Sequence, residues 1–317
     1  MIEKKQQKPS NYMEKSKAMT NFLSFQNPED IKILSEVKAI YTDVDGTLLA
    51  PGGSFLRNTS GEVSYELAQK ICELQKAGIK IILVSGRNQK VLNELARLFS
   101  LDGYISELGT VIAHKTETGY SNEYFLGEFE FKEDEYASPF EQVLKSGLPD
   151  KLIQNFSGRL EHSMPYALER SVTQSLWGNI DEDEASDMVK ASKLPFELVN
   201  NGIIHPKEHG LSLGKDEPIY IYHLVPKGVS KASALLKDMQ TRGYSAQEVV
   251  SLGDSPADVH MAKVSGSYVV MKNALKQERV SYVLQGVKTP TFKTSLEYVD
   301  GWCEFADALL KATTSSL

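Results

Sequence analysis

Apolar runs and helical spacings alternate along the first third of the chain. Residues 37–42 predict a first strand, and residues 79–84 form a nearly continuous apolar run, which is typical of a strand buried on both faces of a parallel sheet. Apolar residues repeat at helical spacing within 62–77, a second helix is predicted over 88–99, and a third strand over 103–106. Strands that alternate with helices in this way predict an α/β fold with a doubly wound, mainly parallel sheet.

The alternation stops near residue 119 and resumes near residue 226. The intervening stretch mixes short strand-like and helical pieces with acidic turns, which predicts an inserted α+β domain. Beyond it the pattern predicts a helix over 230–240 and strands over 248–252, 267–271 and 282–284. The predicted organisation is a polar N-terminal extension at 1–35, an α/β core at 36–119 and 226–317, and the inserted domain at 120–225.

Composition narrows the function classes. A formal net charge of -7 argues against a general affinity for nucleic acid or for anionic membranes. No stretch approaches the roughly 18 apolar residues that a membrane-spanning helix needs, and residues 1–20 carry no apolar segment typical of a secretion signal. We therefore expect a cytoplasmic protein. Cys72 and Cys303 lie far apart in no metal-ligand spacing, which favours packing roles over a disulfide or a zinc site.

Paired carboxylates follow the first predicted strand, in the segment Asp43-Val44-Asp45-Gly46-Thr47. Side chains two apart on a strand point to the same side, so Asp43 and Asp45 can face one site. Two neighbouring carboxylates suit a Mg²⁺ ion, and they can also divide nucleophilic attack from proton transfer. The alternative is a plain hairpin, because Asp-Gly is a strong turn signal.

Two further segments lie where a helix is predicted to begin. Ser85-Gly86-Arg87 follows the second strand, and a hydroxyl beside exposed helix N-terminal amides can bind phosphate. Lys231 follows Ser230, a plausible N-cap, although a cation is unfavourable at the positive end of a helix dipole. A turn and a solvated lysine are the respective alternatives. A functional lysine that neutralises phosphate and carboxylates would explain the unfavourable position.

The last such segment is Gly253-Asp254-Ser255-Pro256-Ala257-Asp258, at a predicted strand exit. Its aspartates either cap the following helix or complete a metal site. All four segments lie at the carboxyl ends of predicted strands or at the helix starts beyond them. Open α/β sheets place their active sites at that edge, so the four together predict one catalytic centre.

In this order, Asp-x-Asp-Gly-Thr, Ser-Gly-Arg, Lys and Gly-Asp-x-x-x-Asp resemble the motifs of the haloacid dehalogenase superfamily of phosphohydrolases. The resemblance covers about residues 37–115 and 226–285. The insertion between the second and third motifs is similar to a C2-type cap, in particular the C2B form of Cof-like sugar phosphatases and mannosyl-3-phosphoglycerate phosphatase-like proteins. The resemblance implies a Mg²⁺-dependent phosphatase that acts on a small phosphorylated metabolite, such as a sugar phosphate or a phosphoglycerate-like compound.

The resemblance also implies residue roles. Asp43 would be the nucleophile that forms an aspartyl-phosphate, and Asp45 the general acid and then the general base. Lys231 would offset the charge of the transferring phosphoryl group. The implied phosphate-binding residues are Thr47, Ser85, Gly86, Arg87 and Lys231. The implied metal site consists of Asp43, the backbone carbonyl of Asp45, and Asp254, with Asp258 in support.

The sequence departs from the family in two motifs. Ser106-Glu107-Leu108-Gly109-Thr110 lacks the asparagine of the usual Glu-Asn-Gly, and Ala257 stands where asparagine often precedes the last aspartate. Neither change removes a catalytic group. Within the insertion the pattern favours surface positions, or loops and strands, over ligand contacts for the charged residues, and a packing role for the aromatic ones. These residues are Arg159, His162, Arg170, His205, His209 and His223, and Phe156, Tyr166 and Trp177.

Two alternatives stay open at this point. A phosphosugar mutase would share the nucleophile and the cap but would return the phosphate to a sugar. A catalytically idle homologue would serve as a binding or regulatory protein, although Asp43, Asp45, Lys231 and Asp254 are all present. Phosphate release in a Mg²⁺-dependent assay separates both from a phosphatase.

Overall fold

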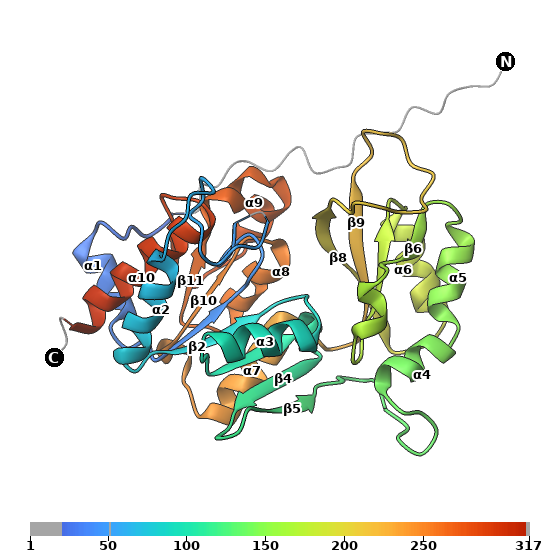
Figure 1. The fold of residues 1–317 in the computed structure, drawn as a ribbon, viewed down its shortest axis with the longest axis horizontal. Coiled ribbons are helices and arrows are strands. Elements are labelled where there is room, and N and C mark those ends of the chain that lie inside the picture. The colour runs from blue at the N-terminus through green and yellow to red at the C-terminus, as the bar shows by residue number, and fades with distance from the viewer. Residues whose placement is uncertain (1–20, 51, 315–317) are drawn as a thin grey trace.

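The computed structural model describes residues 21–50 and 52–314, apart from the side chain of Tyr166. The chain forms two lobes, each built around its own sheet (Figure 1). No helix in the described part of the chain is long and apolar enough to cross a bilayer.

An eight-stranded sheet forms the larger lobe. Its strands lie in the order β12-β11-β10-β1-β2-β3-β4-β5. All neighbours from β12 to β3 pair in parallel, and β4 and β5 add an antiparallel edge. The strands are β1 (Ala39–Thr42), β2 (Lys80–Val84), β3 (Gly103–Ser106), β4 (Val111–Lys115), β5 (Tyr120–Tyr124), β10 (Val249–Gly253), β11 (Ser267–Val270) and β12 (Thr291–Lys293). The predicted doubly wound, mainly parallel fold is confirmed.

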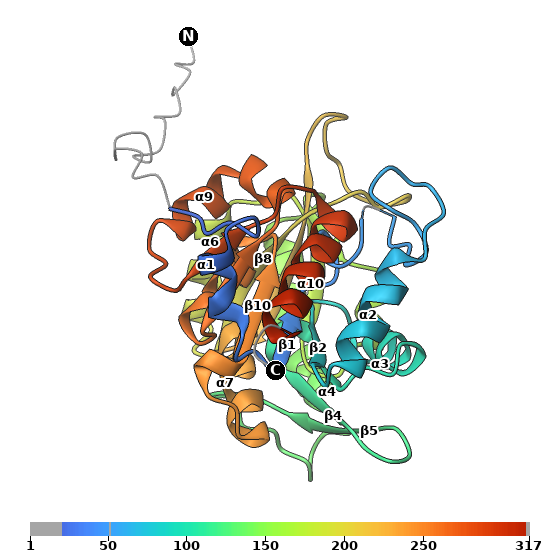
Figure 2. The same cartoon turned by 90° about the vertical axis from the view of Figure 1, so that its left-hand side faces the viewer.

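Helices cover both faces of this sheet (Figure 2). On β1, Ile40 packs with apolar residues of α2, α3 and α10, whereas Tyr41 packs with those of α7 on the opposite face. Continuous apolar strands are needed for this arrangement because successive side chains alternate between the two faces. The helices are α2 (Glu66–Lys76), α3 (Gln89–Leu98), α7 (Lys231–Arg242), α8 (Pro256–Val259), α9 (Glu278–Leu284) and α10 (Tyr298–Thr314).

The second lobe is inserted between β5 and α7. Its four-stranded antiparallel sheet, in the order β6-β7-β9-β8, packs against three helices over a separate apolar core. This arrangement confirms the predicted inserted α+β domain. Its elements are α4 (Pro139–Lys145), α5 (Leu148–Asn155), β6 (Leu160–His162), the 3₁₀ turn η3 (Tyr166–Glu169), β7 (Gln174–Gly178), α6 (Glu182–Ala191), β8 (Phe196–Ile204) and β9 (Ile219–Pro226).

The segment predicted as a strand over 282–284 is instead the end of helix α9. Val280 and Leu284 are buried one helical turn apart, while Tyr282 between them is more than half exposed. The last strand of the sheet is β12, further along the chain. A run of three apolar residues was too short to distinguish strand from helix, and the i, i+4 burial shows the helical period.

The ends of the predicted domains also differ from those in the structure. β5 hydrogen-bonds to β4, so it lies in the large sheet although the insertion was predicted to start at residue 120. Helix α1 (Pro28–Ile31) and the turn η1 (Lys32–Leu34) lie within the predicted polar extension, yet Leu34 is fully buried in the α/β core. Phe25 stacks on Phe292 at 4.9 Å between ring centroids. The rest of that prediction, over 1–20, lies outside the described residues.

Candidate active site

Asp43 lies directly beyond β1, near the middle of the sheet. Its backbone N–H continues the parallel pairing by donating to Leu252 O at 3.0 Å, which places the end of β1 beside the end of β10. The residue is 5% exposed. Because β1 pairs in register with β10 and β2, the segments that leave these three strands meet at one edge, as the sequence predicted.

Lys231 is the cation that holds Asp43. It is the first residue of α7, which Ser230 caps by accepting a hydrogen bond from Ser233 N. Lys231 Nζ lies 2.7 Å from Asp43 Oδ1 and 2.7 Å from Asp258 Oδ1, and all three side chains are buried. Burial alone would lower the pKa of Lys231, but the two carboxylates reverse this and raise it. The lysine is therefore a fixed positive charge in the site.

Three aspartates converge beside this lysine. One carboxylate oxygen each from Asp43, Asp254 and Asp258 lies within 4.8 Å of the others. Burial, with a smaller contribution from Asp258, raises the pKa of Asp43 to about 7 against the lowering effect of Lys231. The pKa of Asp254 is also raised by burial and by the neighbouring carboxylates. Clustered buried carboxylates of this kind are stabilised by a cation or by protons.

The roles of Asp254 and Asp258 differ in geometry. Asp258 Oδ1 accepts from Lys231, while its Oδ2 accepts from Ser255 Oγ at 2.6 Å and Ser255 N at 2.9 Å. Both of its oxygens are thus engaged by protein donors. Asp254 accepts one side-chain hydrogen bond, a long one of 3.3 Å from Asn273 Nδ2. Asp254 and Asp43 therefore offer the more available oxygens, and Asp258 ties the lysine to the loop after β10.

Asn273 belongs to the site and was not found from the sequence. Its Nδ2 donates to Gly46 O at 2.9 Å as well as to Asp254, so it joins the first and last motifs. A Cβ on Gly46 would lie 2.2 Å from Asp254 Oδ2, and Gly46 also has a φ of +87°. Only glycine fits this close approach. The signal that could have found Asn273 is its place just after β11, at the same sheet edge.

Asp45 is not a member of the three-aspartate cluster among the described residues. Its carboxylate binds the Arg87 guanidinium through two contacts, Nε to Oδ2 at 2.7 Å and Nη2 to Oδ1 at 2.5 Å. Its side chain is 56% exposed, and that of Arg87 is 31% exposed. Asp45 raises the pKa of Arg87, so the guanidinium is positively charged. The structure thus places Arg87 on the predicted acid–base residue.

Two of the remaining predicted phosphate ligands, Thr47 and Ser85, have buried hydroxyls. Thr47 is fully buried, and within the described residues its Oγ1 has no hydrogen-bond partner. Ser85 is 3% exposed, and its Oγ accepts from Arg87 N at 3.2 Å. A buried hydroxyl without a protein partner is unfavourable unless a ligand or water satisfies it. The Thr47 hydroxyl is therefore a polar group that a ligand or water could satisfy, and the Ser85 hydroxyl, which accepts a hydrogen bond, still has a proton to donate.

The inserted domain contributes a contact that the sequence did not indicate. Arg170 was predicted at the surface, but its side chain is 5% exposed and its Nη2 donates to Gly86 O at 2.9 Å. Arg170 can be buried because its guanidinium has a hydrogen-bond partner, and a charged side chain is retained inside a protein only where partners satisfy it. Nothing in the sequence indicated that partner. Arg159 pairs with Glu217 within its own domain, and His162 lies 3.7 Å from Asp150.

The other residues singled out in the insertion pack as its fold requires. Phe156 and Trp177 are buried, as predicted, whereas the side chain of Tyr166 lies outside the described part. His223 is buried on β9, where burial and nearby cations lower its pKa. The metal-like cluster of the described residues includes none of the histidines. In the core, Cys303 is buried but Cys72 is exposed, so only the former packs as predicted.

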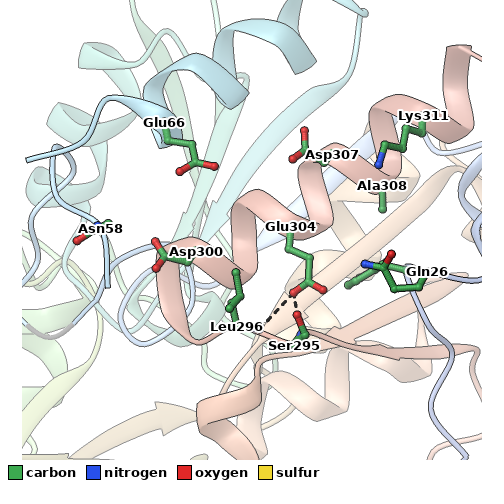
Figure 3. Close-up of a pocket in the computed structure, with 11 residues that line it drawn as sticks. Gln26, Asn58, Glu66, Ser295, Leu296, Asp300, Glu304, Asp307, Ala308 and Lys311 are labelled. Carbon is green, nitrogen blue, oxygen red and sulfur yellow. Dashed lines mark hydrogen bonds between the residues drawn. The ribbon is translucent and has the colours of Figure 1, made fainter. Parts of the chain in front are cut away.

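A pocket of about 460 Å³ lies along α10, and its lining also includes Gln26, Asn58 and Glu66 (Figure 3). None of its lining residues is a predicted site residue. Its carboxylates already serve the fold, since Glu304 accepts from Ser295 N and Leu296 N, and Asp307 pairs with Lys70. The pocket therefore gives no reason to move the candidate site from the aspartate cluster.

Comparisons with known proteins identify the family and agree with the fold. A family model described as haloacid dehalogenase-like hydrolase matches residues 40–134 and 199–281, more than half of the chain. A phosphoglycolate phosphatase of Methanoculleus marisnigri is 25% identical over 240 residues, which cover 75% of this chain and 85% of that one. A Bacillus subtilis 5-amino-6-(5-phospho-D-ribitylamino)uracil phosphatase is 25% identical over 251 residues, covering 78% and 90%.

Solved structures share the fold. The sucrose-phosphatase of Synechocystis, in complex with sucrose and phosphate, superimposes with a TM-score of 0.56 at 16% identity, covering 87% of this chain and 96% of that one. A Thermoplasma acidophilum protein gives a TM-score of 0.56 at 17% identity, covering 86% and 98%. At these identities the likeness concerns the fold alone.

Proposed function

The chain belongs to the haloacid dehalogenase-like hydrolases, and from this premise we propose that it is a Mg²⁺-dependent phosphatase that forms an aspartyl-phosphate on Asp43. The predicted resemblance to Cof-like phosphohydrolases is confirmed by the family match and the named relatives. The observation that carries the proposal is the buried cluster of Asp43, Asp254 and Asp258, with Lys231 Nζ at 2.7 Å from two of them.

Relatives support a small phosphorylated metabolite as the substrate. Two curated relatives are named for phosphoglycolate and for a phosphoribitylamino-uracil, and the structural neighbour holds sucrose and phosphate. These names share a phosphoric monoester on a small polar molecule. We propose the same substrate class here, with no preference among its members.

The donor set fits Mg²⁺. Asp43 and Asp254 present carboxylate oxygens within 4.8 Å of one another, and Mg²⁺ prefers oxygen ligands, commonly one or two carboxylates together with substrate phosphate. Asp43, Asp254 and the backbone carbonyl of Asp45 would hold the ion, while Asp258 supports it through the loop after β10. When bound, Mg²⁺ neutralises the phosphoryl oxygens and lowers the repulsion between phosphate and Asp43.

The two carboxylates beyond β1 would divide the chemistry. The Asp43 carboxylate attacks phosphorus in line with the leaving oxygen, and the bond from phosphorus to that oxygen breaks while Asp45 supplies its proton. Asp45 then takes a proton from a water molecule that attacks the same phosphorus, which releases inorganic phosphate and frees Asp43. Lys231 stays protonated throughout and offsets the negative charge.

Arg87 can bind either Asp45 or a phosphate. It is bound to Asp45 in this structure, but a phosphate offers the same bidentate geometry with more charge. We propose that a bound phosphate competes for Arg87 and so frees the Asp45 carboxylate for proton transfer. The inserted domain would cover the site and select the leaving group, since Asn201 on β8 reaches Gly86.

A screen of phosphorylated metabolites tests the proposal. Purified protein is incubated with each monophosphate and Mg²⁺, and inorganic phosphate is measured, with EDTA as the control. Phosphate release that EDTA abolishes supports a Mg²⁺-dependent phosphatase. Absence of release from every monoester contradicts the proposed function, and transfer of phosphate to a sugar would identify a mutase instead.

A further inference from the structure

Three successive carbonyls of the Ser85–Arg87 loop are held by hydrogen bonds. Leu108 N donates to Ser85 O at 3.2 Å, and Glu107 N donates to Arg87 O at 2.9 Å. The middle carbonyl, that of Gly86, accepts from Arg170 of the inserted domain at 2.9 Å. The core fixes the two ends of the loop, and the inserted domain fixes its centre.

The peptide between Gly86 and Arg87 links Arg170 to Ser85. In a trans peptide the N–H points opposite to the C=O. When Arg170 holds the Gly86 carbonyl, the Arg87 N–H points the other way, where it donates to Ser85 Oγ at 3.2 Å. Arg170 thus helps to set the orientation of the peptide group that donates to the Ser85 hydroxyl.

Glu107 holds Arg170 and its neighbours in place. Its fully buried carboxylate accepts from the backbone N–H groups of residues 171–173 at 2.7 to 3.2 Å. It also accepts from Thr173 Oγ1 at 3.0 Å, and that hydroxyl accepts in turn from Arg170 Nε at 2.7 Å. A buried carboxylate with four such donors is a strong anchor. The backbone of Glu107 has a φ of +52°, which is uncommon for a residue other than glycine.

Gly86 also meets the inserted domain from a second direction. A Cβ at this position would lie 2.5 Å from Asn201 Nδ2, so the absence of a side chain lets β8 approach the loop. Ser171 Oγ donates to Gln89 Oε1 at 2.9 Å, just beyond the loop at the start of α3. The inserted domain therefore docks on the phosphate-binding loop itself rather than on a remote surface of the core.

We propose that Arg170, anchored by Glu107, is a positioning residue through which the inserted domain holds Ser85 and its loop in the phosphate-binding geometry. This inference rests on the proposed function for its kinetic readout. It assigns Arg170 no contact with substrate. Loss of its guanidinium frees the Gly86–Arg87 peptide and the Ser85 hydroxyl, while the aspartate cluster and Lys231 keep their contacts.

The experiment compares Arg170→Ala with the wild-type chain in a steady-state phosphatase assay. A misplaced loop should lower kcat about tenfold to hundredfold, because catalysis depends on sub-ångström positioning. It should also weaken inhibition by inorganic phosphate, the probe of this loop. Added guanidinium should restore part of kcat in Arg170→Ala and leave the control Arg97→Ala unchanged, since Arg97 pairs with Glu94 on the exposed side of α3.

Unchanged kcat and unchanged phosphate inhibition in Arg170→Ala would overturn the inference. A loss of kcat that guanidinium does not restore would also overturn it, because that result indicates a merely structural role. If Arg170→Ala does not fold, Arg170→Lys decides, since it keeps a cation beside Glu107 but cannot reach both Gly86 O and Thr173 Oγ1. At least a threefold loss of kcat then supports the inference, and wild-type kcat contradicts it.

The outcome can be separated from that of the proposed function. If the wild type releases no phosphate from any monoester, the phosphatase proposal fails. The role of Arg170 is then read from calorimetric binding of inorganic phosphate, which should be weaker in Arg170→Ala than in the wild type and in Arg97→Ala. Equal phosphate binding in the three proteins would overturn the positioning role.

Discussion

Asp43 and Asp45 stand two residues apart after the same strand, yet their surroundings are opposite. Asp43 is 5% exposed and is held by Lys231 within a cluster of buried carboxylates. The side chain of Asp45 is 56% exposed and binds Arg87. A nucleophile benefits from a fixed position, and a proton carrier benefits from access to the leaving oxygen and to water. Under the proposed function, the difference in environment suits the two identical side chains to different roles.

The largest effect is expected from removing the buried member of the pair. Asp43→Asn should lower turnover about 10⁴-fold or more, because it deletes the proposed nucleophile. The fold should remain, since an amide of the same shape replaces the carboxylate. Steady-state phosphate release together with circular dichroism checks this. Asp134→Asn, at an exposed position of the inserted domain, is the matched control and should leave turnover unchanged. Substantial activity in Asp43→Asn would refute the mechanism.

Removal of the exposed member should cost less. Asp45→Asn should lower kcat about 10³-fold, the range typical of general acid–base catalysis. The loss should be smallest for substrates with good leaving groups, such as aryl phosphates, because they need little protonation. Kinetics with a poor and a good leaving group measure the difference. Equal losses for both substrates would show that Asp45 does not protonate the leaving oxygen.

Replacement of Lys231, which binds the buried Asp43 and not Asp45, should affect both turnover and the stability of the fold. Lys231→Met should lower kcat about 10²-fold by removing a charge that stabilises the transition state. It also leaves Asp43 and Asp258 without their cation, so the free energy of unfolding should fall by about 3 kcal/mol in EDTA. Chemical denaturation with EDTA and with Mg²⁺ measures this, and Mg²⁺ should recover part of the loss. A variant as stable as wild type in EDTA would contradict the buried ion pairs.

Mg²⁺ affinity should depend on pH through the buried side of the site. The pKa of Asp43 is raised to about 7, so below that pH the metal must displace a proton. Affinity should fall about tenfold or more per pH unit below about 7, because the raised pKa of Asp254 adds a second proton that the metal must displace. Without metal, in EDTA, the free energy of unfolding should depend on pH in the opposite direction. The raised pKa of Asp43 stabilises the folded state below about pH 4, and this contribution is lost as the pH rises through about 7.

Calorimetric Mg²⁺ titrations at about pH 6 and about pH 8 check this dependence. The Asp43→Asn variant is the control, because it has no carboxyl to titrate at that position and should show a flatter profile. An affinity for Mg²⁺ that is the same at both pH values in the wild type would argue against a proton on Asp43.

The smallest effect is expected at the residue that joins the motifs. Asn273→Ala removes the hydrogen bonds to Gly46 O and Asp254, and should weaken Mg²⁺ binding about threefold to tenfold. The Asp45–Arg87 pair lies outside these contacts, so inhibition by phosphate without metal should stay unchanged. If Asn273→Ala changed the inhibition by phosphate and left Mg²⁺ binding unchanged, Asn273 would act with the Asp45–Arg87 pair rather than with the buried aspartates.

The sequence predicted the features of the fold that depend on residues close together in the chain. The apolar runs of β1 and β2 and the glycine and aspartate positions after them gave the sheet, its active edge and the convergence of Asp43, Lys231 and Asp254. The position of Asn273 and the burial of Arg170 depend on chain segments that meet only in the folded protein. The same holds for Phe25, whose ring stacks on Phe292 from the other end of the chain. The prediction of a strand over 282–284 was wrong, because three apolar residues do not distinguish the period of a strand from that of a helix.

The central claim is that Asp43 carries the phosphoryl group, and trapping that adduct tests it most directly. In Asp45→Asn, the water that hydrolyses the adduct lacks its base, so the adduct should accumulate when the protein is mixed with Mg²⁺ and a phosphate ester that has a good leaving group. Mass spectrometry of the acid-quenched, digested protein should then find one phosphoryl group on the peptide that contains Asp43. A phosphoryl group on another residue, or none while phosphate is still released, would contradict the proposed mechanism.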